Sequence, residues 1–333
     1  MLEFSMIHAD SRRAALEGWL SDRLHGARFA LTPASEDASF RRYFRARLDD
    51  GRSFVVMDAP PDKEDCRPFL HVARLLRAAG VHAPEVHAQD LAQGLLLLSD
   101  LGERTYLAVI DDSNAPALFA DATEALIRWQ LATQEGGLPP YDEALLRREM
   151  RLFPDWYVAR HLGRELNYQQ KQTLEDIFAL LARSALAQPK VYVHRDYMPR
   201  NLMVSDPNPG VLDFQDAVMG PIAYDVVSLM RDAFVTWDDE RVLDWSVRYW
   251  EKAKKAGLPV DPDFGEFWRA LEWMGLQRHL KVLGIFARIR YRDGKPKYLA
   301  DTPRFLRYAR DVAGRYAALS PLIRLFDQLK CEP

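Results

Sequence analysis

The chain has 333 residues, of which 48% are hydrophobic and 28% charged, and its formal net charge at pH 7 is −3. These values are ordinary for a folded globular protein, and the length predicts two domains or one unit with two lobes. Acidic and basic residues are interspersed without a basic tract, so we expect neither nucleic acid nor a membrane as a partner.

The N-terminal part of the chain predicts a small sheet with two helices. An amphipathic helix is expected over residues 11–24, because Leu16 and Leu20 fall on one side of it. A second helix is expected over residues 68–79, with Gly80 as its C-terminal cap. Strands are expected at residues 29–34, 40–48, 52–59, 85–89 and 94–99.

From Thr105 onward the pattern is mostly helical. We therefore predict an α+β fold with two lobes. A small, β-rich N-terminal lobe spans residues 1–99, and a larger, α-rich C-terminal lobe spans residues 100–333. No internal repeat or low-complexity linker interrupts either part.

The most informative stretch, residues 191–216, contains VYVHRDYMPRNLMV followed by VLDFQD. It places Asp196 and Asn201 on one short loop between two apolar runs, and Asp213 at the end of the next short strand. In phosphoryl transfer from ATP, one Asp orients and deprotonates the attacking hydroxyl, while an Asn and a second Asp hold Mg²⁺. We therefore predict Asp196 as the catalytic base and Asn201 and Asp213 as Mg²⁺ ligands. The order of these residues matches the signatures of the protein-kinase-like fold; the plainer alternative is a polar turn and a β-hairpin.

The residues after Asp213 indicate a small substrate. Protein kinases continue with a long activation loop and an Ala-Pro-Glu motif, whereas here Gly220 and Pro221 are followed at once by an apolar helix. This pattern resembles the aminoglycoside phosphotransferase family of small-molecule kinases, which share the protein-kinase fold. The resemblance implies a buried structural role for Asp225. A chain without an activation loop is expected to be constitutively active.

Two further residues of the motif are expected to support the catalytic loop. We expect His194 to brace the loop rather than to titrate, and Arg195 to pair with a nearby acid.

The predicted nucleotide site departs from the kinase pattern. Residues 34–45 carry no Gly-x-Gly-x-x-Gly loop, but Ser39 has a hydroxyl donor, and Arg41 and Arg42 bring positive charge suited to phosphate oxygens. The connector after the last strand, with Leu98, Asp100 and Leu101, is expected to bond adenine through its backbone. The alternatives are an exposed arginine-rich strand and a plain loop.

The strand over residues 54–58 has no Lys, and the helix over residues 68–79 has no Glu, so both halves of the usual kinase ion pair are missing together. Their joint absence leaves neither charge unpaired. We hypothesise a pair of reversed polarity between Asp58 and Arg74, with the arginines of the preceding strand at the phosphates.

The combined motifs resemble, more narrowly, the anomeric amino-sugar kinases of bacterial cell-wall recycling. That resemblance extends from about residue 34 to about residue 283, and it implies transfer of phosphate to the C1 hydroxyl of N-acetylmuramate and N-acetylglucosamine, giving the α-1-phosphate. It also implies ATP and Mg²⁺ as cofactors and a small amino sugar as the substrate.

The sugar pocket is expected in the C-terminal lobe. Sugars favour aromatic faces beside polar groups, and such residues occur around a helix break at Pro154, next to the metal motif and on a later helix. The candidates are Glu149, Asp155, Trp156, Gln215, Asp216 and Arg278. Arg278, or its neighbour Lys281, would meet the lactyl carboxylate of N-acetylmuramate. The alternative is that the aromatic residues belong to the core and the cations to a solvated face.

Two other functions remain open from the sequence. One is a kinase of the same family that acts on an aminoglycoside, choline or a homoserine-like alcohol; the basic region at Arg278 argues against the two cationic substrates. The other is a nucleotide-binding pseudokinase, which the missing Lys supports and the intact Asp196, Asn201 and Asp213 oppose.

The cysteines and the N-terminus bear on location. Cys66 and Cys331 lie far apart without a Cys-x-x-Cys or His cluster, so neither disulfides nor zinc are expected. The first residues lack the pattern of a signal peptide, and the apolar run 95–98 is too short to span a bilayer. We expect a monomer in the reducing cytoplasm.

Overall fold

The computed structural model describes residues 2–35 and 40–332. The chain forms two compact units. The N-terminal unit consists of Met1–Arg104 and Met203–Gln215, and the C-terminal unit consists of Thr105–Leu202 and Asp216–Pro333.

The N-terminal unit is built on a five-stranded antiparallel sheet in the order β1-β2-β3-β5-β4. The strands are β1 (Phe29–Ser35), β2 (Arg42–Leu48), β3 (Ser53–Asp58), β4 (Val86–Asp90) and β5 (Leu95–Ser99). The predicted strands are thus present with bounds shifted by a few residues. The turn at Gly51, with φ of 88°, joins β2 to β3 in a register that glycine permits.

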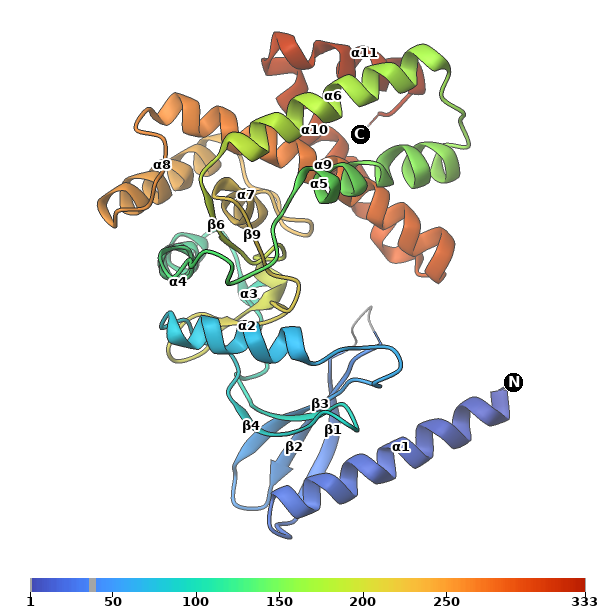
Figure 1. Cartoon of the computed structure of the whole chain (residues 1–333), viewed down its shortest axis with the longest axis vertical. Helices are drawn as coiled ribbons and strands as arrows, with labels where there is room; N and C mark the ends of the chain where they lie inside the picture. The colour runs from blue at the N-terminus through green and yellow to red at the C-terminus, as the bar shows by residue number, and fades with distance from the viewer. Residues whose placement is uncertain (1, 36–39, 333) are drawn as a thin grey trace. The chain divides into compact units, whose positions relative to one another are not determined.

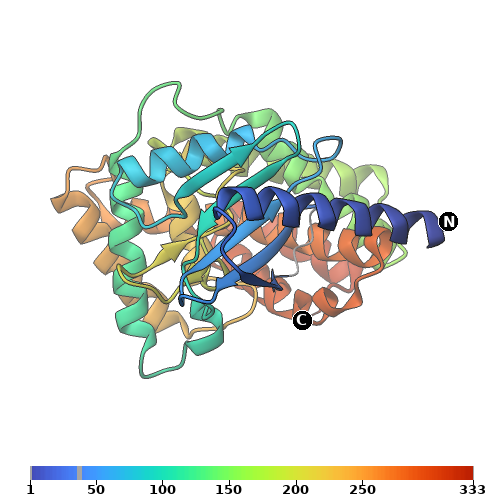
Figure 2. The same cartoon turned by 90° about the horizontal axis from the view of Figure 1, so that it is seen from below.

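Two helices accompany the sheet, α1 (Leu2–Arg23) and α2 (Arg67–Ala78) (Figures 1 and 2). Helix α1 begins nine residues before the predicted start at residue 11. Its Leu16 and Leu20 are fully buried in one cluster with Val56 of β3 and Leu97 of β5, so α1 covers one face of the sheet. The alternation of side chains along these strands directs this apolar set toward the helix.

The C-terminal unit is mainly helical, and two short strand pairs lie at its catalytic motif, one of which is mostly part of the N-terminal unit. The α-helices are α3 (Tyr106–Val109), α4 (Ala115–Leu131), α5 (Glu143–Met150), α6 (Tyr168–Ala187), α7 (Ala223–Met230), α8 (Asp239–Lys255), α9 (Phe264–Asp293), α10 (Thr302–Arg315) and α11 (Ser320–Leu329). The strands are β6 (Lys190–Val193), β7 (Leu202–Met203), β8 (Gly210–Val211) and β9 (Val218–Pro221), with β7 and β8 leading into the N-terminal unit.

Helix α9 lies at the centre of this unit and contacts α5, α6, α7 and α10 (Figure 1). The π-helical segment η1 (Phe153–His161) also packs on it, and the helix break predicted at Pro154 is this change from α to π geometry. A Cβ at Gly284 would lie 2.2 Å from the carbonyl carbon of Leu152, so only glycine permits the approach. This contact fixes the chain beyond α5 against α9.

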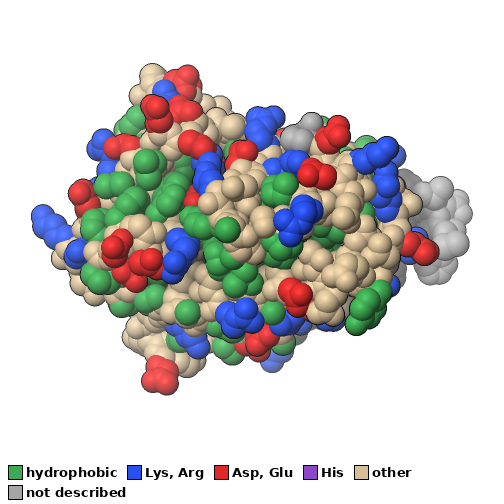
Figure 3. Space-filling view, turned by 90° about the horizontal axis from the view of Figure 1, so that it is seen from above, with side chains coloured by type: hydrophobic (Ala, Val, Ile, Leu, Met, Phe, Trp, Pro, Cys, Tyr) green, Lys and Arg blue, Asp and Glu red, His purple; other side chains and the backbone are tan. Residues whose placement is uncertain are grey.

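The surface shows no dominant sign of charge on the face drawn in Figure 3, where basic and acidic side chains are interspersed with hydrophobic ones. Among the described helices, none combines the length and the apolar character that crossing a membrane requires.

Candidate active site

The loop between β6 and β7 carries the predicted base, and hydrogen bonds within the loop define its shape. The side-chain amide of Asn201 donates through Nδ2 to the main-chain oxygen of Asp196 at 2.9 Å. The buried ring of His194 accepts the Asp196 N–H at Nδ1, at 3.3 Å. The Tyr197 hydroxyl donates to the main-chain oxygen of Ala122 on α4 at 2.7 Å. The loop is therefore closed on itself and attached to a helix of the same unit.

Asp225 on α7 binds the backbone at the start of this loop from the interior of the unit. It is fully buried, and its carboxylate accepts the backbone N–H of His194 at 2.6 Å and that of Arg195 at 3.0 Å. Burial raises the pKa of Asp225 to about 7, although the two N–H bonds oppose the shift. Arg195 has a φ of 76°, which is unusual for a residue with a side chain, and these two bonds stabilise that conformation.

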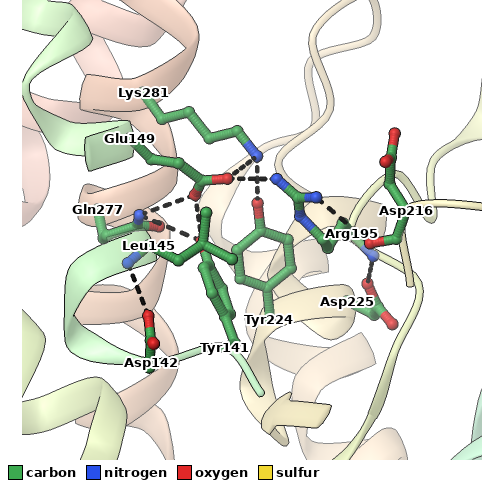
Figure 4. Close-up of polar contacts among 10 residues, drawn as sticks. All are labelled: Tyr141, Asp142, Leu145, Glu149, Arg195, Asp216, Tyr224, Asp225, Gln277 and Lys281. Atoms are coloured by element: carbon green, nitrogen blue, oxygen red, sulfur yellow. Dashed lines mark hydrogen bonds and ion pairs between the residues drawn. The ribbon is translucent and has the colours of Figure 1, made fainter. Parts of the chain in front are cut away.

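The side chain of Arg195 enters a buried polar network centred on Glu149 of α5 (Figure 4). Arg195 Nη2 lies 2.5 Å from Glu149 Oε1, and Lys281 Nζ of α9 lies 3.1 Å from the same oxygen. The other oxygen of Glu149 accepts hydrogen bonds from the Tyr141 hydroxyl and from Gln277 Nε2. Burial opposes ionisation of Glu149, but the charges of Lys281 and Arg195 outweigh it and lower the pKa to about 2. An ionised carboxylate thus joins α5, α9 and the catalytic loop.

A cavity of about 100 Å³ opens beside Asp196. Its wall is formed by the catalytic loop, α7 with the segment after it, and α9. The charged residues that line it are Asp196, Arg200, Arg278 and Lys281, and its apolar residues include Phe234 and Phe286. The site therefore combines one carboxylate with three cations in the same unit.

The residues predicted for the sugar pocket are dispersed. Arg278 lines the cavity beside Asp196 and is 2% exposed. Of the other described candidates, Glu149 is 5% exposed within its network, Asp155 and Asp216 are exposed, and Trp156 is half-buried. None of these four lines this cavity.

Two predicted residues belong to the N-terminal unit with the hairpin segment 203–215. Gln215 Nε2 donates to Asp213 Oδ1 at 2.9 Å, and Asp213 has a φ of 63°. The aromatic ring before Gln215, Phe214, packs on Phe69 of α2 with centroids 4.8 Å apart. The segment is therefore anchored to α2 of its own unit.

The hypothesis of an Asp58–Arg74 pair is wrong. Asp58 is fully buried and pairs instead with Arg12 of α1, at 2.6 Å from Nε, and with Arg42 of β2, at 2.9 Å from Nε. The physical reason is register, because Arg42 is directly opposite Asp58 in the β2–β3 ladder. An acidic residue, Asp58, thus ends the strand in which kinases have a Lys, and its basic partners lie on α1 and β2.

The other residues predicted at the nucleotide have the following positions. Asp100 makes a bidentate pair with Arg45, at 2.6 and 3.0 Å, and also accepts a bond from Ser53. Leu98 and Leu101 are buried. Arg41 lies 3.7 Å from Glu64. Ser39 lies outside the described residues.

A comparison with sequence profiles of protein families shows the class of protein. The sequence profile of the phosphotransferase enzyme family matches residues 30–267. The chain belongs to this family, and it is a phosphotransferase that uses ATP, as predicted from the order of its motifs.

Relatives with more than half of their residues identical to this chain share one kinase name. The chain is 60% identical over 299 residues to an N-acetylmuramate/N-acetylglucosamine kinase of Pseudomonas aeruginosa, covering 90% of this chain and 88% of the relative. It is 51% identical over 322 residues to the protein of that name from Neisseria meningitidis serogroup B, covering 96% of each. The predicted resemblance to the amino-sugar kinases is confirmed.

Solved structures confirm the predicted fold class. A choline kinase from Streptococcus pneumoniae aligns with a TM-score of 0.64 at 12% identity, covering 90% of this chain and 99% of that one. A putative aminoglycoside phosphotransferase from Ralstonia eutropha aligns with a TM-score of 0.61 at 14% identity, covering 94% and 98%. These likenesses show the shared protein-kinase-like fold.

Two residues for which the sequence predicts no role lie at the site in the structure. Arg200 lies inside the catalytic motif and lines the cavity, and Tyr141 is the buried donor to Glu149. The signal for Arg200 was available, because it is a cation four residues after the predicted base. For Tyr141, no local sequence pattern indicates its hydrogen bond to Glu149.

Proposed function

We propose that this chain transfers the γ-phosphoryl group of ATP to the C1 hydroxyl of N-acetylmuramate and N-acetylglucosamine. The product would be the α-1-phosphate, made during recycling of the bacterial cell wall. The observation that carries the proposal is Asp196 in the wall of a small cavity that three cations also line, on a loop held by Asp225. Relatives that bear this kinase name match at 51–60% identity over nearly their whole length.

Asp196 acts as the base in this proposal. It accepts the proton of the anomeric hydroxyl and aligns the oxygen with the γ-phosphorus, so that a weak nucleophile attacks in line. His194, Arg195 and Asp225 position the base rather than react. Glu149 joins this positioning set, because its carboxylate is engaged by Arg195 and Lys281 and is almost fully buried.

Mg²⁺ is proposed to be held by Asn201 and Asp213. An amide oxygen and a carboxylate are the hard oxygen donors that Mg²⁺ prefers, and Mg²⁺ commonly takes one or two protein ligands together with substrate phosphates and water. Among the described residues no cluster of three or more His, Cys, Asp or Glu side chains offers a protein-only metal cage. Bound Mg²⁺ would offset the charge that develops on the transferred phosphoryl group.

The nucleotide contacts remain proposals. The backbone near Leu98, Asp100 and Leu101 is proposed to bond adenine, and Ser39, Arg41 and Arg42 to contact the phosphates. Arg42 is oriented by Asp58 in the structure, which supports a guanidinium held in one direction.

The remaining substrate contacts are proposed for Asp155, Trp156, Gln215, Asp216 and Arg278. Arg278 has the strongest support, because it lines the cavity that contains Asp196. The three cations of that cavity disfavour choline or an aminoglycoside as the acceptor, since both carry positive charge. Intact loop geometry around Asp196 disfavours a pseudokinase.

We also propose that the enzyme works as a monomer in the cytoplasm. Cys66 and Cys331 are both free thiols in the structure, which suits a reducing compartment.

A substrate panel tests the proposed function. ADP release from Mg²⁺-ATP is measured with N-acetylmuramate, N-acetylglucosamine, choline and an aminoglycoside at equal concentrations. The proposal expects turnover with the two amino sugars only. Turnover with choline or the aminoglycoside and none with the sugars would replace it by another kinase activity, and no acceptor-dependent turnover would favour the pseudokinase.

A further inference from the structure

The cavity beside Asp196 has an unequal distribution of charge. Its charged lining consists of Asp196 and the cations Arg200, Arg278 and Lys281. The volume of about 100 Å³ is somewhat below the roughly 150 Å³ of an engineered cavity that admits benzene. It therefore suits one substituent of a few heavy atoms on the sugar ring whose hydroxyl Asp196 deprotonates.

Two of the three cations have acidic partners in the protein. Lys281 Nζ lies 3.1 Å from Glu149 and 3.0 Å from the Tyr224 hydroxyl. Burial raises the pKa of Asp225 and of Asp232, and the charge of Arg278 opposes the shift in both. Arg278 thus lies near two buried carboxyl groups, and its one hydrogen bond among the described residues is a 3.4 Å contact with the Arg231 carbonyl.

Arg200 differs from both. Among the described residues it forms neither an ion pair nor a hydrogen bond, and its guanidinium lies over the Phe234 ring at 5.3 Å from the centroid. A guanidinium whose face packs on an aromatic ring keeps its N–H groups at the edge, where they match a planar carboxylate. Phe234 also lines the cavity, so the stacked pair forms part of its wall.

We propose that Arg200, supported by Phe234, recognises a carboxylate on the acceptor sugar. This inference rests on the proposed function, and it adds a residue that distinguishes its two substrates. N-acetylmuramate has a lactyl carboxylate and N-acetylglucosamine has none, so Arg200 favours the first.

The test compares kcat/KM for the two sugars in the wild type, in Arg200→Gln and in Arg200→Lys. We expect Arg200→Gln to lower the ratio of kcat/KM, N-acetylmuramate over N-acetylglucosamine, by about tenfold to a hundredfold, the usual range for a lost charged hydrogen bond. Arg200→Lys keeps the charge and should retain part of the ratio. The matched control is Arg248→Gln on the exposed face of α8, which should leave the ratio unchanged.

A second measurement uses the wild type alone. The primary amide of the lactyl group of N-acetylmuramate keeps its number of heavy atoms but removes its charge, and we expect its kcat/KM to fall by a similar factor. This result does not depend on how well a variant folds.

The possible outcomes are distinct. An equal loss for both sugars, or a raised KM for ATP in Arg200→Gln, would overturn the inference, because Arg200 would then serve the phosphates. An unchanged ratio in Arg200→Gln, or an amide that reacts as well as the free acid, would also overturn it while leaving the sugar kinase intact. If neither sugar is phosphorylated by the wild type, the proposed function and this inference fail together.

Discussion

Glu149 on α5 and Arg195 in the catalytic loop form a buried ion pair, with Oε1 and Nη2 2.5 Å apart. Lys281 of α9 forms a second ion pair with the same oxygen of Glu149, at 3.1 Å. In many protein kinases a phosphate group added to the activation loop supplies the anion that pairs with Arg. Here the carboxylate of Glu149 pairs with the arginine of the catalytic loop (Figure 4), and constitutive activity stays a prediction.

Glu149→Gln tests this pair. It leaves Arg195 and Lys281 buried without a full counter-charge, and removing one partner of such a group commonly costs about 3–5 kcal/mol. We expect a lower free energy of unfolding in urea, together with a lower kcat because the loop loses its support. Glu143→Gln on the same helix is the control, since Glu143 is 55% exposed in its pair with Arg147 and should change stability by less than about 1 kcal/mol. Equal stability of the two variants would contradict the network.

The pH dependence of stability gives an independent check on Glu149. Its pKa in the folded protein is about 2, below the ordinary 4.5, so its contribution is present above pH 4.5 and is lost as the pH falls toward 2. We therefore expect the difference in unfolding free energy between wild type and Glu149→Gln to shrink from pH 6 to pH 3. A difference that stays constant over this interval would show that folding does not lower the pKa of Glu149, and a difference that grows toward pH 3 would show that its carboxyl is neutral in the folded state.

Asp196→Asn tests the base. The amide keeps the shape of the side chain but cannot accept the proton of the hydroxyl, so we expect kcat to fall by about 10²–10⁴ with little change in either KM. Unfolding should remain as in the wild type, because the loop is held by the main chain of Asp196 and by its neighbours. A rise of comparable size in the KM for the sugar or for ATP, with kcat unchanged, would indicate a binding role instead.

Asp213→Asn tests the metal ligand. Weakening one oxygen donor should raise the Mg²⁺ concentration needed for half-maximal rate, so that added Mg²⁺ recovers part of the activity. The measurement is a Mg²⁺ titration at saturating ATP and sugar. A variant with the wild-type Mg²⁺ requirement and undiminished kcat would exclude Asp213 from metal binding.

Arg42→Ala addresses the phosphate contact. Its guanidinium is fixed by the buried Asp58, and we expect its loss to raise KM for ATP by about tenfold, the scale of one charged hydrogen bond. Arg12 also pairs with Asp58, so Arg12→Ala is the control for any indirect effect of disturbing that acid. Equal changes in KM for ATP in both variants would assign Arg42 a structural role only.

The sequence predicted the local features of the fold well. The strands of the N-terminal sheet are bounded by turn signals such as Gly51, and the catalytic motif is contiguous, so both are readable within short windows. The partner of Asp58 was missed because ladder register, rather than the spacing of charges, places Arg42 opposite it.

Long-range partners are the part that the sequence did not provide. Glu149 was expected at the sugar, yet Arg195 lies 46 residues away along the chain and contacts it through the packing of α5 against the catalytic loop. Arg200 was visible in the motif, but its importance depends on Phe234 and on the cavity wall. Such roles follow from tertiary packing, which no local pattern encodes.

The most direct test of the account is phosphorus NMR of the product formed from ATP, Mg²⁺ and N-acetylmuramate by the wild-type enzyme and by Asp196→Asn. We predict a single α-anomeric phosphate on C1 with the wild type and almost none with the variant. A phosphate on another hydroxyl, or the same C1 product at an undiminished rate from Asp196→Asn, would contradict it.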